Sequence, residues 1–440
     1  MYVSKRKFIL GMISAIVIIL GLKAFISYRN IEGIGLINTV ILMGIICLFV
    51  FNAIKQKIII NPFTLYLLLP ISLFLYDQNV STHYLVKLTQ DTYNMAFYNM
   101  VMYFLGLLFM LHLKIKLSPS AWSFGEGLTP SSHARIAFKM LIVGMVPSVL
   151  TLFMGLSAIT NMNTLRSIYG GIPLASVLSL LLYPGIFFAF KSGNRRVIIM
   201  AVVCILINLY TSFSKSTLTM LCMTMLIYIY VWAQKDYRRK KWLTTAVIVI
   251  VVVVFLSFEV YNNIRFEYNL NDYFDDLGYV GNISNSMFLP YMYITSPWSN
   301  VQNFLETTTE FTHGLWLLKP FLGYAQLDSL FLQSYELVPR FSAFNTYTYI
   351  SVFFLDFGVF GSGICSFFLA MYTMYLYRMF LLYSESPLIQ GVYALNVYAM
   401  FMMFFNNHFL QLSYPITIVL IAWAINRFNR RRLQQENKEK

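Results

Sequence analysis

Charged residues are scarce in this sequence, and their scarcity limits the kind of protein that it can encode. Only 11% of the 440 residues are Asp, Glu, Lys or Arg, whereas soluble domains carry about 25%. A chain with so few charges cannot surround a core with a solvated surface. A soluble enzyme, a nucleic-acid-binding domain and a disordered chain are therefore excluded.

Residues that form disulfides or bind metals are also few. The four cysteines, at positions 47, 204, 222 and 365, all fall inside apolar runs, where they behave as small apolar residues. None belongs to a CxxC pair, and the five histidines show no HxxxH or HExxH spacing. We therefore expect no disulfide framework, no metal site and no cofactor.

Hydrophobic residues make up 58% of the chain. They are grouped in runs of about 20 residues, the length that crosses a hydrocarbon core of about 30 Å. The sequence therefore predicts an all-α polytopic membrane protein with about 12 transmembrane helices. The expected spans are 8–27, 33–53, 58–76, 95–113, 138–159, 172–190, 197–213, 217–234, 242–260, 347–376, 388–407 and 409–426.

The distribution of charge predicts the orientation of these helices. With both termini in the cytoplasm, 24 of the 32 Lys and Arg residues fall in cytoplasmic segments and seven in external ones. Positive charge on the cytoplasmic side is the rule that orients membrane helices. The net charge of +14 is therefore explained by topology, and no nucleic-acid partner is expected.

Polar residues are concentrated in one long external segment, 261–345. A structureless loop of this length is unusual, so we expect it to be functional and partly helical. Segments 301–310 and 314–324 have the pattern of short amphipathic helices at the membrane surface. The predicted organisation is thus a membrane bundle (1–260), a large external loop or lid (261–345), C-terminal membrane helices (346–426) and a basic cytoplasmic tail (427–440).

Four basic residues stand out on the external face, which is acidic overall. Arg166 and Lys215 lie in short turns between spans, Arg265 follows the ninth span, and Arg340 precedes the tenth. Such cations can converge on a phosphate or pyrophosphate, which arginine binds bidentately. Each of them can equally mark a helix end and pair with a lipid headgroup or a nearby acid.

The spans themselves contain almost no charge, which favours an enzyme of the external interface over a carrier. Asp356 is the single deep acid. We expect its carboxylate to pair with Arg340 or with a backbone donor, and the glycines near it to allow close helix packing.

Several short motifs in the last third of the chain resemble those of Wzy-type polymerases, which join O-antigen or capsular oligosaccharide repeat units in bacteria. The motifs are 293–300 (YITSPWSN), 312–314 (THG), 319–320 (KP), 345–348 (NTYT) and 356–361 (DFGVFG). Family members also have many spans, a short external loop carrying Arg and a large external loop near the C-terminal end. Where they often have a Gly-Gly-Arg-like turn, this sequence has Ser214-Lys215-Ser216.

The resemblance implies a glycosyltransferase of the bacterial plasma membrane. Its substrates would be repeat units linked to undecaprenyl pyrophosphate, joined at the external face by a metal-independent reaction. Membrane lipids, a chain-length-regulating co-polymerase and a flippase are the further partners that it implies.

Candidate site residues follow from this chemistry. Arg166 and Arg265 are the first choices to stabilise the pyrophosphate leaving group, followed by Lys215 and Arg340. His313 is the candidate general base. The alternatives for this role are Glu306, Glu310, Glu336 and His408. For contacts with the glycan, the candidates are Tyr291, Trp298 and Asn300, although aromatic residues are also typical of the membrane interface.

Two alternative functions remain open. A lipid-linked oligosaccharide flippase has a similar size and span number, but it needs polar or charged residues around a central cavity. A glycan ligase resembles the polymerases in topology and transfers finished chains to a different acceptor.

Overall fold

A computed structural model describes most of the chain. The described residues are 34–56, 60–77, 85, 87–113, 128–172, 174–234, 285–324 and 346–410, with the single positions 245, 249, 252 and 253. Every regular element within these residues is a helix. The predicted helical class is therefore confirmed for this part of the protein.

Eight helical stretches in the described ranges are long and apolar enough to cross a membrane. Each coincides with a predicted span. They comprise α2 (Ile34–Lys55), α5 (Gln90–His112), α6 (Pro130–Met154), α8 and α9 together (Ala175–Ser179 and Leu182–Ser192), α10 (Arg195–Ser212), α11 (Lys215–Ala233), α17 (Tyr349–Leu382), and α18 (Pro387–Phe401) with the 3-10 turn η3 (Met402–Phe404).

The third predicted span, 58–76, is divided into two helices, α3 (Pro62–Tyr66) and α4 (Leu68–Asp77). The side chain of Asn61 caps α3 by accepting a hydrogen bond from the backbone N–H of Thr64 at 3.1 Å. Pro70 has no N–H with which to continue the helix. Predicted spans 8–27 and 409–426 lie outside the described residues, as does 242–260 apart from the four single positions. The total of 12 spans and the orientation stay predictions.

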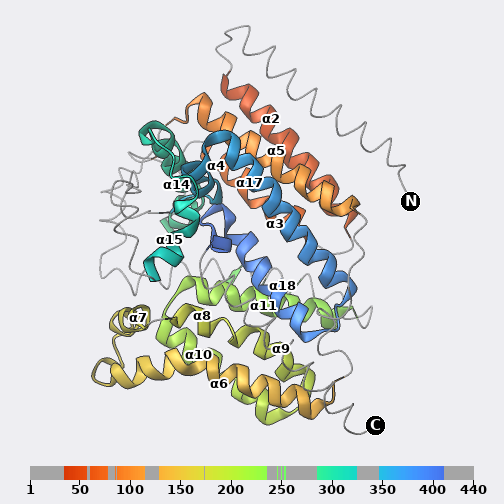
Figure 1. The fold of residues 1–440 in the computed structure, drawn as a ribbon, viewed down its shortest axis with the longest axis vertical. Helices are drawn as coiled ribbons and strands as arrows, with labels where there is room; N and C mark the ends of the chain where they lie inside the picture. Colours follow the sequence, from red (N-terminus) through yellow and green to blue (C-terminus); the bar gives the residue numbers. More distant parts are fainter. Residues whose placement is uncertain are drawn as a thin grey trace.

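The long helices run side by side, and α18 lies between two groups of them (Figure 1). Helices α2, α5 and α17 are on one side of α18, and α6, α9 and α10 are on the other. Within the α18 span, 89% of the residues are buried, the largest share among the eight. The bundle core is therefore built around α18.

Close packing of α5 against α17 depends on two glycines. A Cβ atom at Gly106 would lie 2.3 Å from the carbonyl oxygen of Phe367, and one at Gly363 would lie 2.1 Å from the Tyr98 ring. No side chain fits at these distances. Small residues allow membrane helices to approach in this way, which agrees with the role expected for Gly363.

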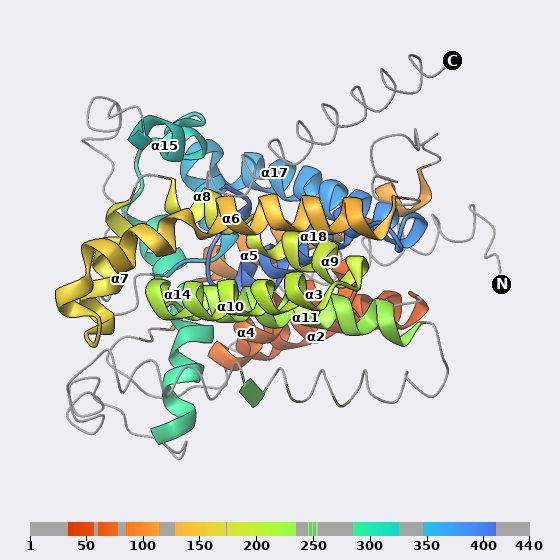
Figure 2. The same ribbon diagram turned by 90° about the horizontal axis from the view of Figure 1, so that it is seen from below.

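Three further helices gather at one end of the bundle, on the left in Figures 1 and 2. They are α7 (Met162–Gly171), α14 (Asn285–Thr307) and α15 (Leu315–Tyr324). At the other end, Lys191 forms an ion pair with Glu385 at 2.7 Å, and Arg378 donates hydrogen bonds to the carbonyls of Met110 and Leu113. All five residues belong to the end that the charge distribution assigns to the cytoplasm.

The structure corrects the expected helix at 301–310. Helix α14 begins at Asn285, continues through Pro290 and Pro297, and ends at Thr307. It packs against α4, and Met292, Trp298 and Val301 are buried. The helix is therefore stabilised by burial against its neighbours. The expected amphipathic helix on the membrane surface is not what forms here. The second expected segment, 314–324, matches α15 closely.

Candidate functional site

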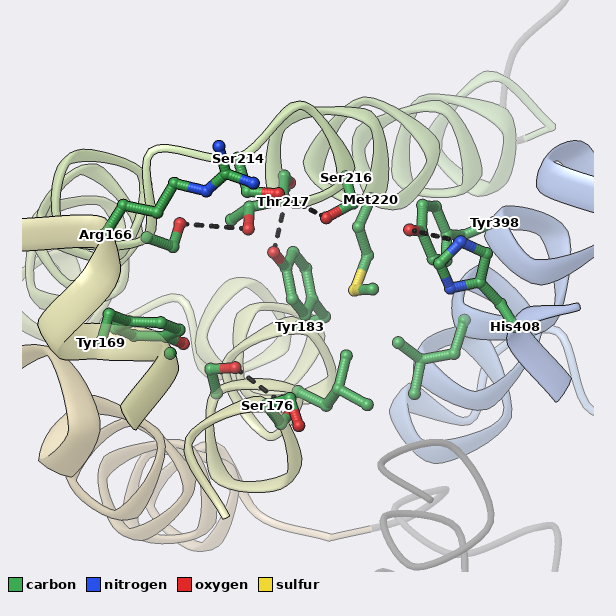
Figure 3. A pocket seen from close by; sticks show the side chains of 15 residues that line it. Arg166, Tyr169, Ser176, Tyr183, Ser214, Ser216, Thr217, Met220, Tyr398 and His408 are labelled. Carbon is green, nitrogen blue, oxygen red and sulfur yellow. Dashed lines mark hydrogen bonds between the residues drawn. The ribbon is translucent and has the colours of Figure 1, made fainter. Parts of the chain in front are cut away.

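A cavity of about 260 Å³ opens at the end of the bundle that carries α7 (Figure 3). Its walls come from α7, α8, the α10–α11 turn, the start of α11, the end of α18 and the 3-10 turn η4 (His408–Leu410). The lining is rich in hydroxyl groups. It consists of Arg166, Tyr169, Gly170, Ser176, Ser179, Leu180, Tyr183, Ser212, Ser214, Ser216, Thr217, Met220, Leu395, Tyr398 and His408.

Arg166 enters this cavity from α7. Asn161 caps the helix, because its side chain accepts a hydrogen bond from the N–H of Thr164 at 3.1 Å. Leu165 is completely buried and contacts Gly155, which holds α7 against the end of α6. Tyr169 follows Arg166 by three residues and therefore lies on the same helix face. Burial raises the pKa of Tyr169, so its hydroxyl stays protonated at neutral pH.

The turn between α10 and α11 supplies most of the hydroxyl groups. It is tight because Phe213 adopts a left-handed conformation, with φ of 34°. The Ser212 hydroxyl donates to Thr217 Oγ1 at 3.1 Å, and the hydroxyls of Ser214 and Ser216 are 2.6 Å apart. Tyr183 donates to the carbonyl of Thr217 at 3.2 Å. These bonds hold the hydroxyl groups in fixed positions around the cavity.

Lys215 lies in the same turn, but its side chain does not line the cavity. Its Nζ atom sits over the ring of Tyr293 in α14, 4.4 Å from the ring centre. A cation in this position is attracted by the negative face of the ring. Lys215 therefore connects the α10–α11 turn to α14.

His408 lies on the opposite side of the cavity from Arg166 (Figure 3). Its Nε2 atom is 3.4 Å from the hydroxyl of Tyr398, and the two rings are 4.9 Å apart. The preceding residue, Asn407, donates to the carbonyl of Tyr349 at 3.4 Å and ties this turn to the start of α17. The sequence named His408 only as an alternative base, and the structure brings it to the cavity.

The other candidate base, His313, lies outside this cavity in an exposed turn before α15. It adopts a left-handed conformation, with φ of 50°, and its backbone N–H donates to the backbone carbonyl of Asp356. Glu306 and Glu310 do not line the cavity either. Glu306 accepts a hydrogen bond from Gln302, one turn earlier in α14.

Asp356 organises the turn that contains His313. Its fully buried carboxylate accepts hydrogen bonds from the N–H groups of Gly314, Trp316 and Leu317 at 2.9–3.1 Å, and from the Thr312 hydroxyl. Asp356 therefore caps the N-terminus of α15 from a different helix. Of the two expected pairings, the one with backbone donors is confirmed.

The three residues proposed to contact the glycan hold α14 in place instead of lining the cavity. Trp298 is fully buried, and its indole N–H donates to Ser72 Oγ at 2.8 Å. Tyr291 donates to the carbonyl of Leu75 at 2.9 Å, and Asn300 donates to that of Thr346 at 2.6 Å. Their polar groups are used between helices, so the structure gives them a packing role.

Arg265, Arg340 and Glu336 fall outside the described residues. Of the predicted site residues, Arg166 and the alternative His408 are therefore the two that the structure brings to one cavity. Sequence reasoning missed Ser176, Tyr183 and Tyr398. The sequence offered no signal for Tyr183 and Tyr398, which lie near the middle of the predicted spans 172–190 and 388–407.

The chemistry of the cavity suits an anionic ligand with many hydroxyl groups. Its described lining contains a guanidinium, an imidazole and several hydroxyls, and no carboxylate. No group of three or more His, Cys, Asp or Glu residues able to hold a metal occurs among the described residues. Comparison of the chain with protein-family models, curated proteins and solved structures found no match.

Proposed function

We propose that this protein is a bacterial polysaccharide polymerase that joins lipid-pyrophosphate-linked repeat units at the external face of the plasma membrane. One observation carries the proposal. Arg166, a cluster of hydroxyl groups and His408 line one cavity at an end of an apolar helical bundle. The motifs that resemble Wzy-type polymerases support the same assignment.

The reaction joins two sugars and releases a lipid pyrophosphate. A hydroxyl oxygen of the acceptor unit attacks the anomeric carbon of the donor and forms the new glycosidic bond. The bond between that carbon and the pyrophosphate oxygen breaks, and the lipid pyrophosphate leaves with the electron pair. The proton of the attacking hydroxyl passes to a general base.

Arg166 and the hydroxyl groups of the α10–α11 turn bind the pyrophosphate. A guanidinium placed where negative charge develops lowers the barrier to departure, because it is already oriented before the reaction. The hydroxyls of Ser214 and Ser216 bond to each other, so one of the two keeps its proton free to donate to a phosphate oxygen. Bonds within the turn reduce the reorganisation that this binding requires.

His408 is the general base in this proposal. A neutral imidazole can take a proton from an attacking hydroxyl, which contributes about 10² to 10⁴ in rate. The Tyr398 hydroxyl beside Nε2 orients the ring. His408 replaces His313 in this role because it lines the cavity that contains Arg166.

The test is the size distribution of glycans from the source cell after deletion of the gene. A polymerase predicts the loss of long polymer while single repeat units persist on lipid or on their final acceptor. Long polymer that stays on its carrier lipid would support a ligase. Repeat units trapped on the cytoplasmic side would support a flippase.

Complementation links this test to the site. The wild-type gene restores long polymer to the deleted strain, and the Arg166→Ala gene does not. Arg196→Ala is the matched control, because Arg196 is exposed at the opposite end of α10. Full restoration of polymer by Arg166→Ala at normal protein level contradicts the proposed site.

A further inference from the structure

Asn208 is a buried amide in an apolar helix, and it connects three helices near the cavity. It lies in the last turns of α10 and is 2% exposed. Its Nδ2 donates to Ser148 Oγ of α6 at 3.1 Å and to the Tyr169 hydroxyl of α7 at 3.2 Å. Burial of an amide costs free energy unless its polar atoms form hydrogen bonds. These two bonds therefore compensate for the burial of the Asn208 side chain.

The bond to Tyr169 bears directly on Arg166. The apolar side of α7 packs on the end of α6, where the side chains of Leu165 and Ile168 both lie beside Gly155. These contacts attach α7 to α6. The bond from Asn208 to Tyr169 is a second anchor on the face that also carries Arg166. Leu165 attaches α7 to the end of α6, and Tyr169, one turn later, attaches it to α10. Anchors on two neighbouring helices restrict the tilt and rotation of α7 and therefore the direction of Arg166.

The residue of α6 that Asn208 contacts, Ser148, is itself held by a buried hydrogen bond. Ser148 and Thr211 are both fully buried, and the Thr211 hydroxyl donates to Ser148 Oγ at 3.0 Å. Asn208 is therefore held by α6 and by its own helix while it reaches α7. The Tyr169 ring, at the far end of this chain of bonds, lines the cavity.

We infer that Asn208 is a positioning residue, which through Tyr169 sets the orientation of α7 and directs Arg166 into the cavity. The role of Arg166 toward a pyrophosphate rests on the proposed function. The restraint on α7 does not, so the two can be tested separately.

The first experiment measures the restraint without any assay of function. Position 166 is changed to cysteine in the full-length protein, and its reaction with a water-soluble methanethiosulfonate reagent is followed by mass spectrometry of the peptide that contains it. The native cysteines can then stay in place. Asn208→Leu, which keeps the side-chain size, is expected to raise the labelling rate about fivefold, the equivalent of one buried hydrogen bond.

Tyr169→Phe removes the same hydrogen bond from its other partner, together with the hydrogen bond of the Tyr169 hydroxyl to Ser179. It is expected to raise the rate by at least the same factor, and the double variant is expected to label no faster than Tyr169→Phe alone. Thr151→Val is the matched control, since the buried Thr151 hydroxyl donates to the Pro147 carbonyl of its own helix. Equal labelling rates in wild type and Asn208→Leu would overturn the inference.

The second experiment separates positioning from a general loss of stability. With a lipid-linked substrate and purified protein, Asn208→Leu is expected to lower polymer formation about fivefold when Arg166 is present. It is expected to leave unchanged the residual activity of Arg166→Ala, about one hundredth of the wild-type rate. Equal fractional losses in both backgrounds, at equal protein level, would mean that Asn208 acts only on stability and would overturn the positioning role. If wild type makes no polymer, the proposed function fails and the labelling rates still decide the inference.

Discussion

Arg166 and His408 lie on opposite sides of one cavity, although they come from helical segments far apart in the chain (Figure 3). Arg166 belongs to α7, and His408 begins η4, the second 3-10 turn after α18. In the proposed reaction, the pyrophosphate leaving group of the donor would lie near the guanidinium and the attacking hydroxyl of the acceptor would lie near the imidazole. The two walls of the cavity would then serve the two chemical tasks of the proposed transfer.

Arg166 is expected to be essential because of its geometry as well as its charge. Arg166→Ala should reduce polymer formation by about 10² or more, the effect of removing one preorganised donor from a transition-state site. Arg166→Lys should recover only part of the activity, because an ammonium lacks the bidentate fork. Polymer per unit of membrane-inserted protein is the quantity to measure. Full activity of the lysine variant would mean that charge alone suffices.

The two histidines should differ in their effect. His408→Asn should lower polymer formation by about 10² to 10⁴, because it removes the proposed base. His313→Asn should leave it unchanged, since asparagine tolerates the left-handed backbone at this position and His313 does not line the cavity. The rate of polymer formation is measured for both variants with the same lipid-linked substrate. The reverse result would return the catalytic role to the turn before α15.

Asp356 should matter for stability and not for catalysis. Asp356→Asn replaces one acceptor oxygen by an N–H₂ group that faces backbone donors, which should cost about 2–3 kcal/mol. Hydrogen exchange at the amides of Gly314, Trp316 and Leu317 should become faster. Asp91→Asn, at an exposed site in the first turn of α5, is the control with little expected effect. Unchanged exchange at the three amides would show that the cap is dispensable.

A substitution of Trp298 distinguishes a role in helix packing from a role in sugar binding. Trp298→Phe should lower the stability of the purified protein by about 2 kcal/mol, because it removes the hydrogen bond to Ser72 and leaves a cavity at a fully buried site. The part due to the hydrogen bond, about 1 kcal/mol, should not add to the effect of Ser72→Ala, because both variants remove the same bond. Polymer formation per folded protein should stay at the wild-type level. A weaker apparent affinity for substrate at unchanged stability would instead indicate contact with the glycan.

The orientation of the bundle can be measured in intact cells. A membrane-impermeant thiol reagent should label Asn163→Cys, on the exposed surface of α7, and should not label Glu385→Cys, at the opposite end. The reagent should reach both positions once the membrane is permeabilised. Labelling of position 385 alone in intact cells would place the cavity on the cytoplasmic side and contradict an external transfer reaction.

The sequence alone was sufficient to place the membrane helices within the described ranges. Runs of apolar residues long enough to cross a bilayer are local features, so their positions were predicted to within a few residues for most helices. Even there, α6 begins at Pro130, eight residues before the predicted 138–159. The first turn of α6 is polar, so hydropathy did not predict that the helix begins there. The side chain of Thr129 caps this turn by accepting a hydrogen bond from the N–H of Ser132.

The sequence did not predict which polar residues share a site. Trp298 and Asn300 are residue types that are common at a membrane interface. Tertiary packing nevertheless buries them, Trp298 against α4 and Asn300 against the segment that leads into α17. His313 and His408 are equivalent as isolated side chains, and only the folded chain brings one of them beside the cavity.

Hydropathy along the chain therefore determined the membrane class and the approximate spans, because the free energy of transferring each segment into lipid depends on that segment alone. The meeting of Arg166 with His408, the cap on α15 by Asp356 and the bond from Asn208 to Tyr169 were decided by tertiary structure. Each joins residues from different helices, and such contacts depend on how the helices pack against one another and on the burial that this packing creates.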